Sequence, residues 1–238
     1  MKALPSWVRI YDEAAHPIVG CEPKLDLLFE NTKYPFAHEA GVYIPQDNSL
    51  WITSNQYSHM ESCKKRIHIS RVRLPSNENT CTNCEELEVK NVPLPNGGVN
   101  YKDGILFCAQ GTHDVSGGIT YMPLNQGDGK GTLEAKMLVS DFHGRPFNSP
   151  NDVVVHSDGS IWFTDPIYGW EQGIRPRPRL PSQVYRFDPA TKGIRAIADG
   201  FGRPNGICFS PDEKTVYITD TDGIHGDGGT DETRASHM

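Results

Sequence analysis

A short apolar phrase built from β-favouring residues recurs four times along the chain. The second residues of successive copies are 55, 56 and 55 positions apart (51 to 106, 106 to 162 and 162 to 217). A near-constant period of this size indicates radially repeated four-stranded sheets rather than a single wound core. The four copies are Leu50-Trp51-Ile52-Thr53, Ile105-Leu106-Phe107-Cys108, Ile161-Trp162-Phe163-Thr164 and Val216-Tyr217-Ile218-Thr219.

The phrases also predict hairpins, because a second apolar run precedes them across a polar turn. Turn residues such as Asp158-Gly159 are hairpin signals, since glycine tolerates positive φ. Further apolar runs predict two more strands per repeat, and four strands per ~50 residues are typical of a propeller blade. First strands are expected at 42–44, 153–155 and 207–209, third strands at 67–72, 119–122 and 184–187, and fourth strands at 87–89, 135–139 and 194–198.

We therefore expect an all-β fold with three full blades and part of a fourth, at about 39–93, 94–149, 150–203 and 204–238. Propellers close on themselves to protect their sheet edges. The expectation is a single domain, 1–238, that is a propeller truncated at its C-terminus. Within the N-terminal segment 1–38, residues 24–29 look like an outer strand of the kind that completes a last blade, and in this chain they have no blade to complete.

The charge pattern narrows the class of partner. The 238 residues include 23 Lys and Arg against 30 Asp and Glu, a net charge of −7 with no basic stripe, so a nucleic-acid partner is not expected. No apolar stretch reaches the ~20 residues of a membrane span, and the N-terminus lacks a signal-peptide segment. We expect a small-molecule partner, no membrane association, a monomer when the propeller is complete, and a cytoplasmic location slightly favoured over secretion.

The six cysteines do not form a recognisable zinc or redox motif. Cys81 and Cys84 form a C-x-x-C pair, but a structural zinc site needs a second pair of ligands and a thioredoxin-like site needs a βαβ context. The simpler interpretation is a loop pair, free or disulfide-bonded. Cys108 and Cys208 lie in apolar strand patterns and are expected to be small core residues.

The register of the repeat selects three polar residues. Glu39 and Asn205 lie twelve positions before the second residue of their phrase, and Asn151 lies eleven before. Equivalent positions on the innermost strands of a propeller face the same part of the central channel, so these side chains should meet. One carboxylate and two amide carbonyls suit a hard divalent cation. Singly, each asparagine is explained as a turn residue, but the shared register in three repeats favours a common site.

Three separated motifs carry a family resemblance over 36–220. In this order and spacing they resemble the gluconolactonase branch of the senescence-marker-protein/gluconolactonase/luciferin-regenerating-enzyme family. The motifs are His38-Glu39-Ala40-Gly41-Val42-Tyr43, then 149–155 with 158–166, and then Arg203-Pro204-Asn205-Gly206-Ile207 with Ser210-Pro211-Asp212.

The resemblance implies a six-bladed propeller that hydrolyses the ester bond of sugar-type or related lactones with one divalent cation. Calcium is the first choice, with magnesium, manganese or zinc as alternatives. Family ligands match Glu39 and Asn205, while Asn151 matches a residue that contacts metal or substrate. The family's remaining ligand, also proposed as its general base, is an aspartate of a fifth blade beyond residue 238. The alternatives are a non-catalytic binding propeller or an inactive fragment without that aspartate.

Weaker candidates lie nearby. Asn100 and His113 are candidate substrate contacts, and His113 is also a weak candidate base, as a histidine is in the distantly similar paraoxonases. His38 and Asp152 adjoin site residues and should point the other way along a strand. Asp165 and Asp220 follow the threonine of their phrases and fit turn capping better than chemistry.

Overall fold

The computed structural model describes residues 8–20, 22–23, 25–58, 64–76, 82–126, 132–234 and 236–237. The chain divides into two compact units, Met1–Glu30 and Asn31–Met238. The first unit contains a 3-10 turn, η1 (Glu13–Ala15), capped by the Asp12 carboxylate, and the short helix α1 (His16–Val19). Among the described residues, no helix combines the length and apolarity that crossing a bilayer requires.

Residues 25–29, the described part of the segment that resembles a closing outer strand, form no strand, and Lys24 lies outside the described residues. The side chains of Leu25 and Leu27 are each 79% exposed. A strand exists only when its backbone N–H and C=O groups find a partner strand. A closing outer strand therefore needs the blade that it completes.

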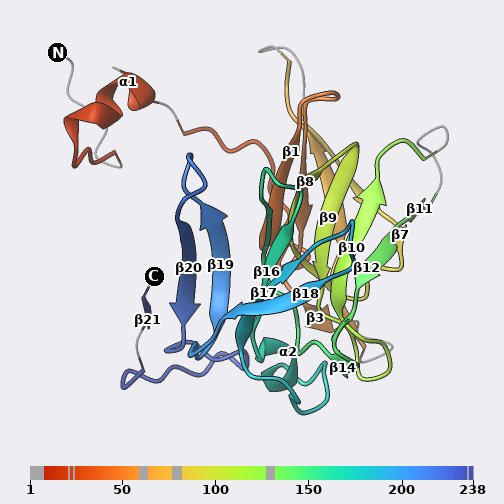
Figure 1. Ribbon diagram of the computed structural model, residues 1–238. Coiled ribbons are helices and arrows are strands. Elements are labelled where there is room, and N and C mark those ends of the chain that lie inside the picture. The colour runs from red at the N-terminus through yellow and green to blue at the C-terminus, as the bar shows by residue number, and fades with distance from the viewer. Residues whose placement is uncertain are drawn as a thin grey trace. The chain divides into compact units, whose positions relative to one another are not determined.

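The second unit consists mainly of four antiparallel sheets that follow one another along the chain (Figure 1). The first sheet contains β1 (Glu39–Ile44), β2 (Ser49–Thr53), β5 (Ile69–Arg73) and β6 (Asn83–Leu87). The second contains β8 (Pro95–Tyr101), β9 (Gly104–Ala109), β10 (Gly118–Pro123) and β12 (Lys136–Val139). The third contains β15 (Val153–Val155), β16 (Ile161–Asp165), β17 (Gln183–Phe187) and β18 (Ile194–Ala198). The fourth contains β19 (Pro204–Phe209), β20 (Val216–Thr221) and β21 (Ser236–His237).

Smaller elements decorate these sheets. The helix α2 (Tyr168–Glu171) lies between β16 and β17. Three two-stranded pairs complete the structure: β3 (Tyr57–Ser58) with β4 (Lys65–Arg66), β7 (Val89–Lys90) with β11 (Leu133–Glu134), and β13 (Asp141–Phe142) with β14 (Arg145–Pro146).

The all-β, propeller-type expectation is confirmed, since every repeated phrase forms the second strand of its sheet and pairs with the strand before it. One strand was misplaced: the fourth strand of the first sheet is β6, not 87–89. Cys84 lies in that strand as a free thiol rather than in a loop, and Cys81 falls outside the described residues. The polar composition of this stretch concealed an edge strand, whose side chains are largely solvated.

Neighbouring sheets pack face to face. In β9 both faces are covered, so Ile105 and Phe107 belong to one apolar cluster shared with the first sheet, while Leu106 and Cys108 belong to another shared with the third. All four side chains are fully buried. Packing of this kind gives each inner strand a fixed position beside the next one.

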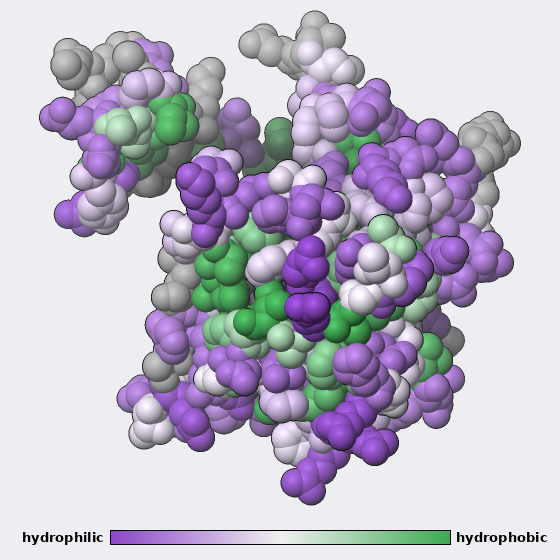
Figure 2. Space-filling model, viewed as in Figure 1, coloured by the Kyte–Doolittle hydropathy of each residue, from purple (hydrophilic) through white to green (hydrophobic). Residues whose placement is uncertain are grey.

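The fourth sheet keeps one face exposed. Figure 2 shows apolar side chains gathered on the surface over β19 and β20, and Tyr217 is 42% exposed. Cys208 is exposed rather than a core residue, because strand alternation points it away from the face of the buried Ile207. The expectation for Cys108 as a core residue is confirmed, and that for Cys208 is wrong.

In the third and fourth sheets, an aspartate at the end of the second strand binds the segment that leads into the first strand. Asp165 and Asp220 directly follow the threonine of their phrase, and each carboxylate accepts two backbone N–H groups from the segment that leads into the first strand of its sheet. Burial raises the pKa of Asp165 to about 7, against the effect of these hydrogen bonds. This confirms a capping role. The donors are Asn148 and Ser149 for Asp165 (2.9 and 2.8 Å), and Gly202 and Arg203 for Asp220 (2.9 and 2.7 Å).

We predict that Asp165→Asn destabilises the fold. The new amide group turns one acceptor into a donor that faces a backbone N–H, and leaving such a buried group unsatisfied costs about 1–3 kcal/mol. Urea unfolding of wild type and variant measures this free energy. The control is Asp141→Asn, because Asp141 accepts the Gly144 N–H in an exposed hairpin and an amide oxygen preserves that bond. Equal unfolding free energies for wild type and Asp165→Asn would contradict the assigned role.

Candidate active site

The first strands of the four sheets are neighbours: β1 contacts β8, β8 contacts β15, and β15 contacts β19. Each phrase begins with a residue that pairs across the hairpin with Tyr43, Asn100, Val155 or Phe209. Counting four residues back from each of these partners gives the same structural position in all four sheets. That position is occupied by Glu39, Asn96, Asn151 and Asn205.

These four residues line one cavity of about 300 Å³. A register shift in β1, β8 and β19 locally kinks the strand close to Glu39, Asn96 and Asn205. Such bulges commonly re-aim side chains next to functional sites. The structure thus brings together the three residues that the sequence register selected.

Asn96 was missed because the hairpin turns differ in length. Between the paired positions lie six residues in the first and fourth sheets (44–49 and 210–215), but only four in the second (101–104). A count of twelve positions back from Leu106 therefore passes Asn96 and ends two residues too far, at Leu94. Allowing for a tighter turn would have found Asn96.

Hydrogen bonds between neighbouring sheets hold the backbone of these positions. In two of the sheets, the threonine that ends the repeated phrase makes this bond. Thr53 Oγ1 donates to the Asn96 carbonyl (3.0 Å), and Thr164 Oγ1 donates to the Asn205 carbonyl (2.6 Å). In the second sheet the threonine is replaced by Cys108, and the Asn151 carbonyl instead accepts Asn96 Nδ2 (3.2 Å). Each asparagine is therefore positioned by the sheet before it.

The cavity concentrates unsatisfied oxygen atoms. Among the described residues, four buried side-chain N or O atoms have no hydrogen-bond partner, and three of them belong to residues that line this cavity: Gln56 Oε1, Asn151 Oδ1 and Gln172 Oε1. The Asn205 amide directs its nitrogen to Thr221 Oγ1 (3.4 Å). Buried acceptors of this kind are costly without a ligand or water.

Glu39 is the carboxylate of the set. Burial, and then the nearby charge of Asp152, raise the pKa of Glu39 to about 7. A cation in the cavity would relieve both effects. Asp152 itself is occupied structurally, since its two oxygens accept the backbone N–H groups of Val153 (2.8 Å) and Ile207 (3.0 Å).

His38 also lines the cavity, so the expectation that it points away is wrong. Strand alternation does not apply to it, because β1 begins at Glu39. His38 Nε2 lies 3.9 Å from Glu39 Oε1, and burial lowers the pKa of His38.

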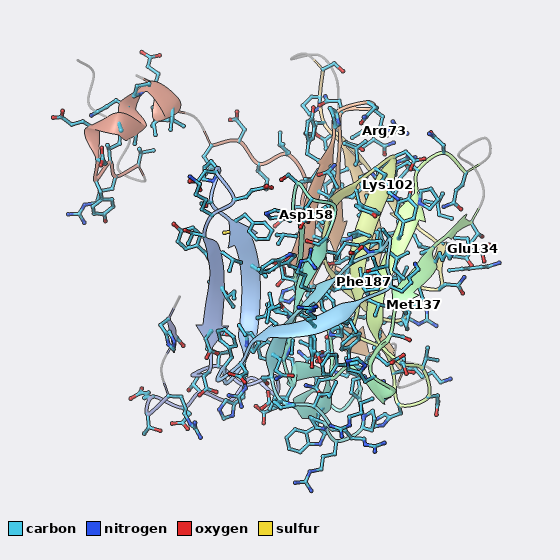
Figure 3. The ribbon with its side chains drawn as sticks, in the orientation of Figure 1. Arg73, Lys102, Glu134, Met137, Asp158 and Phe187 are labelled. Atoms are coloured by element: carbon cyan, nitrogen blue, oxygen red, sulfur yellow. The ribbon has the colours of Figure 1, made fainter. Side chains whose placement is uncertain are left out.

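Asn100 and His113 are not brought to this cavity. Asn100 lies near the other end of β8, beside Lys102, and its Nδ2 donates to the Tyr43 carbonyl (2.9 Å). In Figure 3, Lys102 marks the end of the sheets that is far from α2. His113 Nε2 lies 3.0 Å from the Gly173 carbonyl and lines a separate pocket with Arg175.

Two connecting segments complete the lining. The α2 region contributes Tyr168 and Gln172, and the segment 222–230 contributes His225 among others. The repeat pattern carries no signal for these residues, because their segments differ from one repeat to the next.

The donor set favours a hard cation over a soft one. Within the ranges that the structure describes, no three His, Cys, Asp or Glu side chains cluster in a way that could hold a metal ion. The cavity instead offers one carboxylate and several amide oxygens, which are the ligands of calcium or magnesium. The residues present fit such an ion.

The chain is similar to several known proteins. The chain is 31% identical over 211 residues to lactonohydrolase oryL of Aspergillus oryzae, covering 87% of this chain and 45% of that protein. It is 35% identical over 95 residues to the gluconolactonase of Zymomonas mobilis, covering 38% of this chain and 26% of that protein. The chain spans about half the length of oryL and of the related lactonohydrolase oryH, of which it covers 53%.

A solved structure of a gluconolactonase from Xanthomonas campestris matches with a TM-score of 0.59 and 28% identity, over 81% of this chain and 58% of that one. The sequence also matches the family described as the SMP-30/gluconolactonase/LRE-like region over residues 39–224, which include all four equivalent cavity positions. The chain belongs to the SMP-30/gluconolactonase/LRE-like family.

Proposed function

We propose that this protein hydrolyses the ester bond of sugar-type or related lactones with the help of one divalent cation, calcium first, held by Glu39, Asn151 and Asn205. The observation that carries the proposal is the convergence in one cavity of a carboxylate and three amides from equivalent positions of successive sheets, where one amide oxygen, Asn151 Oδ1, is buried without a hydrogen-bond partner. Family membership and the lactonohydrolase and gluconolactonase relatives support the reaction class.

The lining also suits a hydroxylated substrate. Seven carboxamide side chains face this cavity, each able to donate to and accept from a hydroxyl group. A lactone ring bearing several hydroxyls would donate to amide oxygens that lack partners, such as Gln56 Oε1 and Gln172 Oε1. The seven are Asn55, Gln56, Asn96, Gln110, Asn151, Gln172 and Asn205.

The cation, when bound, would act as a Lewis acid on the carbonyl oxygen of the lactone. Glu39 must be ionised to bind it, and Asn151 and Asn205 would present their amide oxygens. Asn96 lines the same cavity, and its Nδ2 donates to the backbone carbonyl of Asn151. Asn96 would therefore position Asn151, a proposed ligand of the cation. Opening the ring consumes one water and yields a hydroxy acid.

We predict that lactone hydrolysis requires both the cation and Glu39. Chelator should abolish hydrolysis of gluconolactone and added calcium should restore it, while Glu39→Gln should lower kcat/KM by about 100-fold or more, because the ligand charge is lost. A pH-stat assay measures the released acid. Glu88→Gln serves as the control, since Glu88 is exposed outside the cavity. Activity indifferent to chelator and to Glu39→Gln would refute the proposal.

Cation binding should displace a proton from Glu39. With the pKa of Glu39 raised to about 7, the site is half protonated at neutral pH. Binding should then release about 0.5 proton at pH 7 and almost none at pH 9, and apparent affinity should fall as pH drops below 7. Calorimetry in buffers of different ionisation enthalpy measures the number of protons. Binding at pH 7 without proton release would show that Glu39 is not a ligand.

A further inference from the structure

The cavity holds a second set of unsatisfied groups, apart from the residues proposed to bind the cation. Gln56 Oε1 and Gln172 Oε1 are buried and accept no hydrogen bond. Gln56 follows β2 of the first sheet, whereas Gln172 follows α2, between the second and third strands of the third sheet. A buried acceptor without a donor costs stability, so its presence in a cavity indicates a ligand that supplies the donor.

The missing partner of each amide oxygen is a hydrogen-bond donor. A carbonyl or carboxylate oxygen cannot supply one, whereas a hydroxyl group can. Among the described residues that line the cavity there is no Lys or Arg, the side chains that bind anionic groups. The two glutamines therefore fit a neutral ligand that carries hydroxyl groups, and they do not fit the bare ring of an unsubstituted lactone.

Helix α2, at the lower end of the sheets in Figure 1, fixes the backbone at Gln172. The Gln172 N–H donates to the Tyr168 carbonyl (2.8 Å). The preceding residue, Glu171, binds the Arg203 guanidinium (2.5 Å), and both side chains of this pair are only 10% exposed. The other Glu171 oxygen accepts the Gly226 N–H (2.7 Å). The end of α2 is therefore attached to the fourth sheet and to the segment 222–230, which also lines the cavity.

The same ionic network holds the segment after β20. Arg203 also binds the Asp222 carboxylate (2.6 Å), and the other Asp222 oxygen lies 3.5 Å from the Arg234 guanidinium. Arg234 in turn lies 3.9 Å from the Asp231 carboxylate. These charges pair with one another, so the network holds the lining in place and leaves the recognition of a ligand to the neutral amides.

Close packing confines the Gln172 side chain itself. A Cβ atom at Gly226 would lie 3.2 Å from Gln172 Cγ and 2.9 Å from the Tyr168 carbonyl oxygen. Glycine at position 226 therefore leaves the room in which the stem of Gln172 lies. Contacts of this kind restrict the rotamers of the glutamine, and a restricted side chain loses less entropy when it binds a ligand.

We propose that Gln172 is a specificity-determining residue, which accepts a hydrogen bond from a ring hydroxyl of the substrate and so selects hydroxylated lactones over unsubstituted ones. This inference rests on the proposed lactone hydrolysis. Gln56 accepts from a second hydroxyl in the same way. The selection arises because an unsubstituted lactone leaves both amide oxygens buried and unpaired, and a site built to bind a hydroxyl group discriminates against the analogue that lacks it.

The test compares Gln172→Met with wild type in the calcium-loaded protein. Methionine keeps the length of the side chain and removes the amide. The substrates are gluconolactone and δ-valerolactone, a six-membered lactone without hydroxyl groups, and a pH-stat measures both rates. One lost hydrogen bond should lower kcat/KM for gluconolactone about tenfold, while kcat/KM for δ-valerolactone should change less than about threefold. Gln56→Met should shift the ratio of the two values in the same direction.

Stability supplies a second readout. Because Gln172 Oε1 has no partner in the free protein, removal of the amide should leave the Tm of the ligand-free protein equal to or above that of wild type. A glutamine with only a structural role would lower Tm when replaced. Gln46→Met is the matched control, since Gln46 is exposed in the β1–β2 turn outside the cavity, and it should leave both rates unchanged.

Equal changes of kcat/KM for the two lactones in Gln172→Met, or no change for either, overturn the assignment while lactone hydrolysis by wild type stands. A lower Tm overturns it as well, as does a lower calcium affinity measured by calorimetry, because the variant would then act through the fold or the cation. A wild-type protein that hydrolyses neither lactone overturns the proposed function and this role with it.

Discussion

The cavity depends on hydrogen bonds that one sheet makes to the backbone of the next at the position of the cavity residue. Thr53 and Thr164 donate to the carbonyls of Asn96 and Asn205, and Asn96 donates to that of Asn151. Because these bonds use the backbone, the side-chain oxygens stay free for a ligand. The same threonines close the repeated apolar phrase, so the element that builds the core also sets the site.

The sheets pack on one another through apolar side chains, whereas the cavity at one end of their first strands is lined mainly by polar side chains. The chemistry of the site follows from this contrast. At the cavity end of the sheets, burial and then the nearby charge of Asp152 raise the pKa of Glu39 to about 7, and the amide oxygen Asn151 Oδ1 is buried without a hydrogen-bond partner. These arrangements cost stability in the absence of a ligand. Binding of a hard cation and of a hydroxylated substrate would offset that cost.

The repeat pattern predicted the sheets, their hairpins and the convergence of Glu39, Asn151 and Asn205, because these follow from strand period and register. It missed Asn96, since a turn shortened by two residues breaks a fixed count. It placed His38 wrongly, since alternation holds only inside a strand. His225 and Gln172 could not be predicted, because their positions depend on ion pairs and close contacts between connections with no common pattern.

The central claim is that equivalent positions of successive sheets create one cation site, and anomalous scattering tests it most directly. Crystals soaked with a lanthanide, which takes the place of calcium among oxygen ligands, should show one strong peak bound by Glu39, Asn151 and Asn205. Glu39→Gln crystals should lose that peak. A cavity without an ion at saturating concentration, or an ion bound by none of these side chains, would contradict the account.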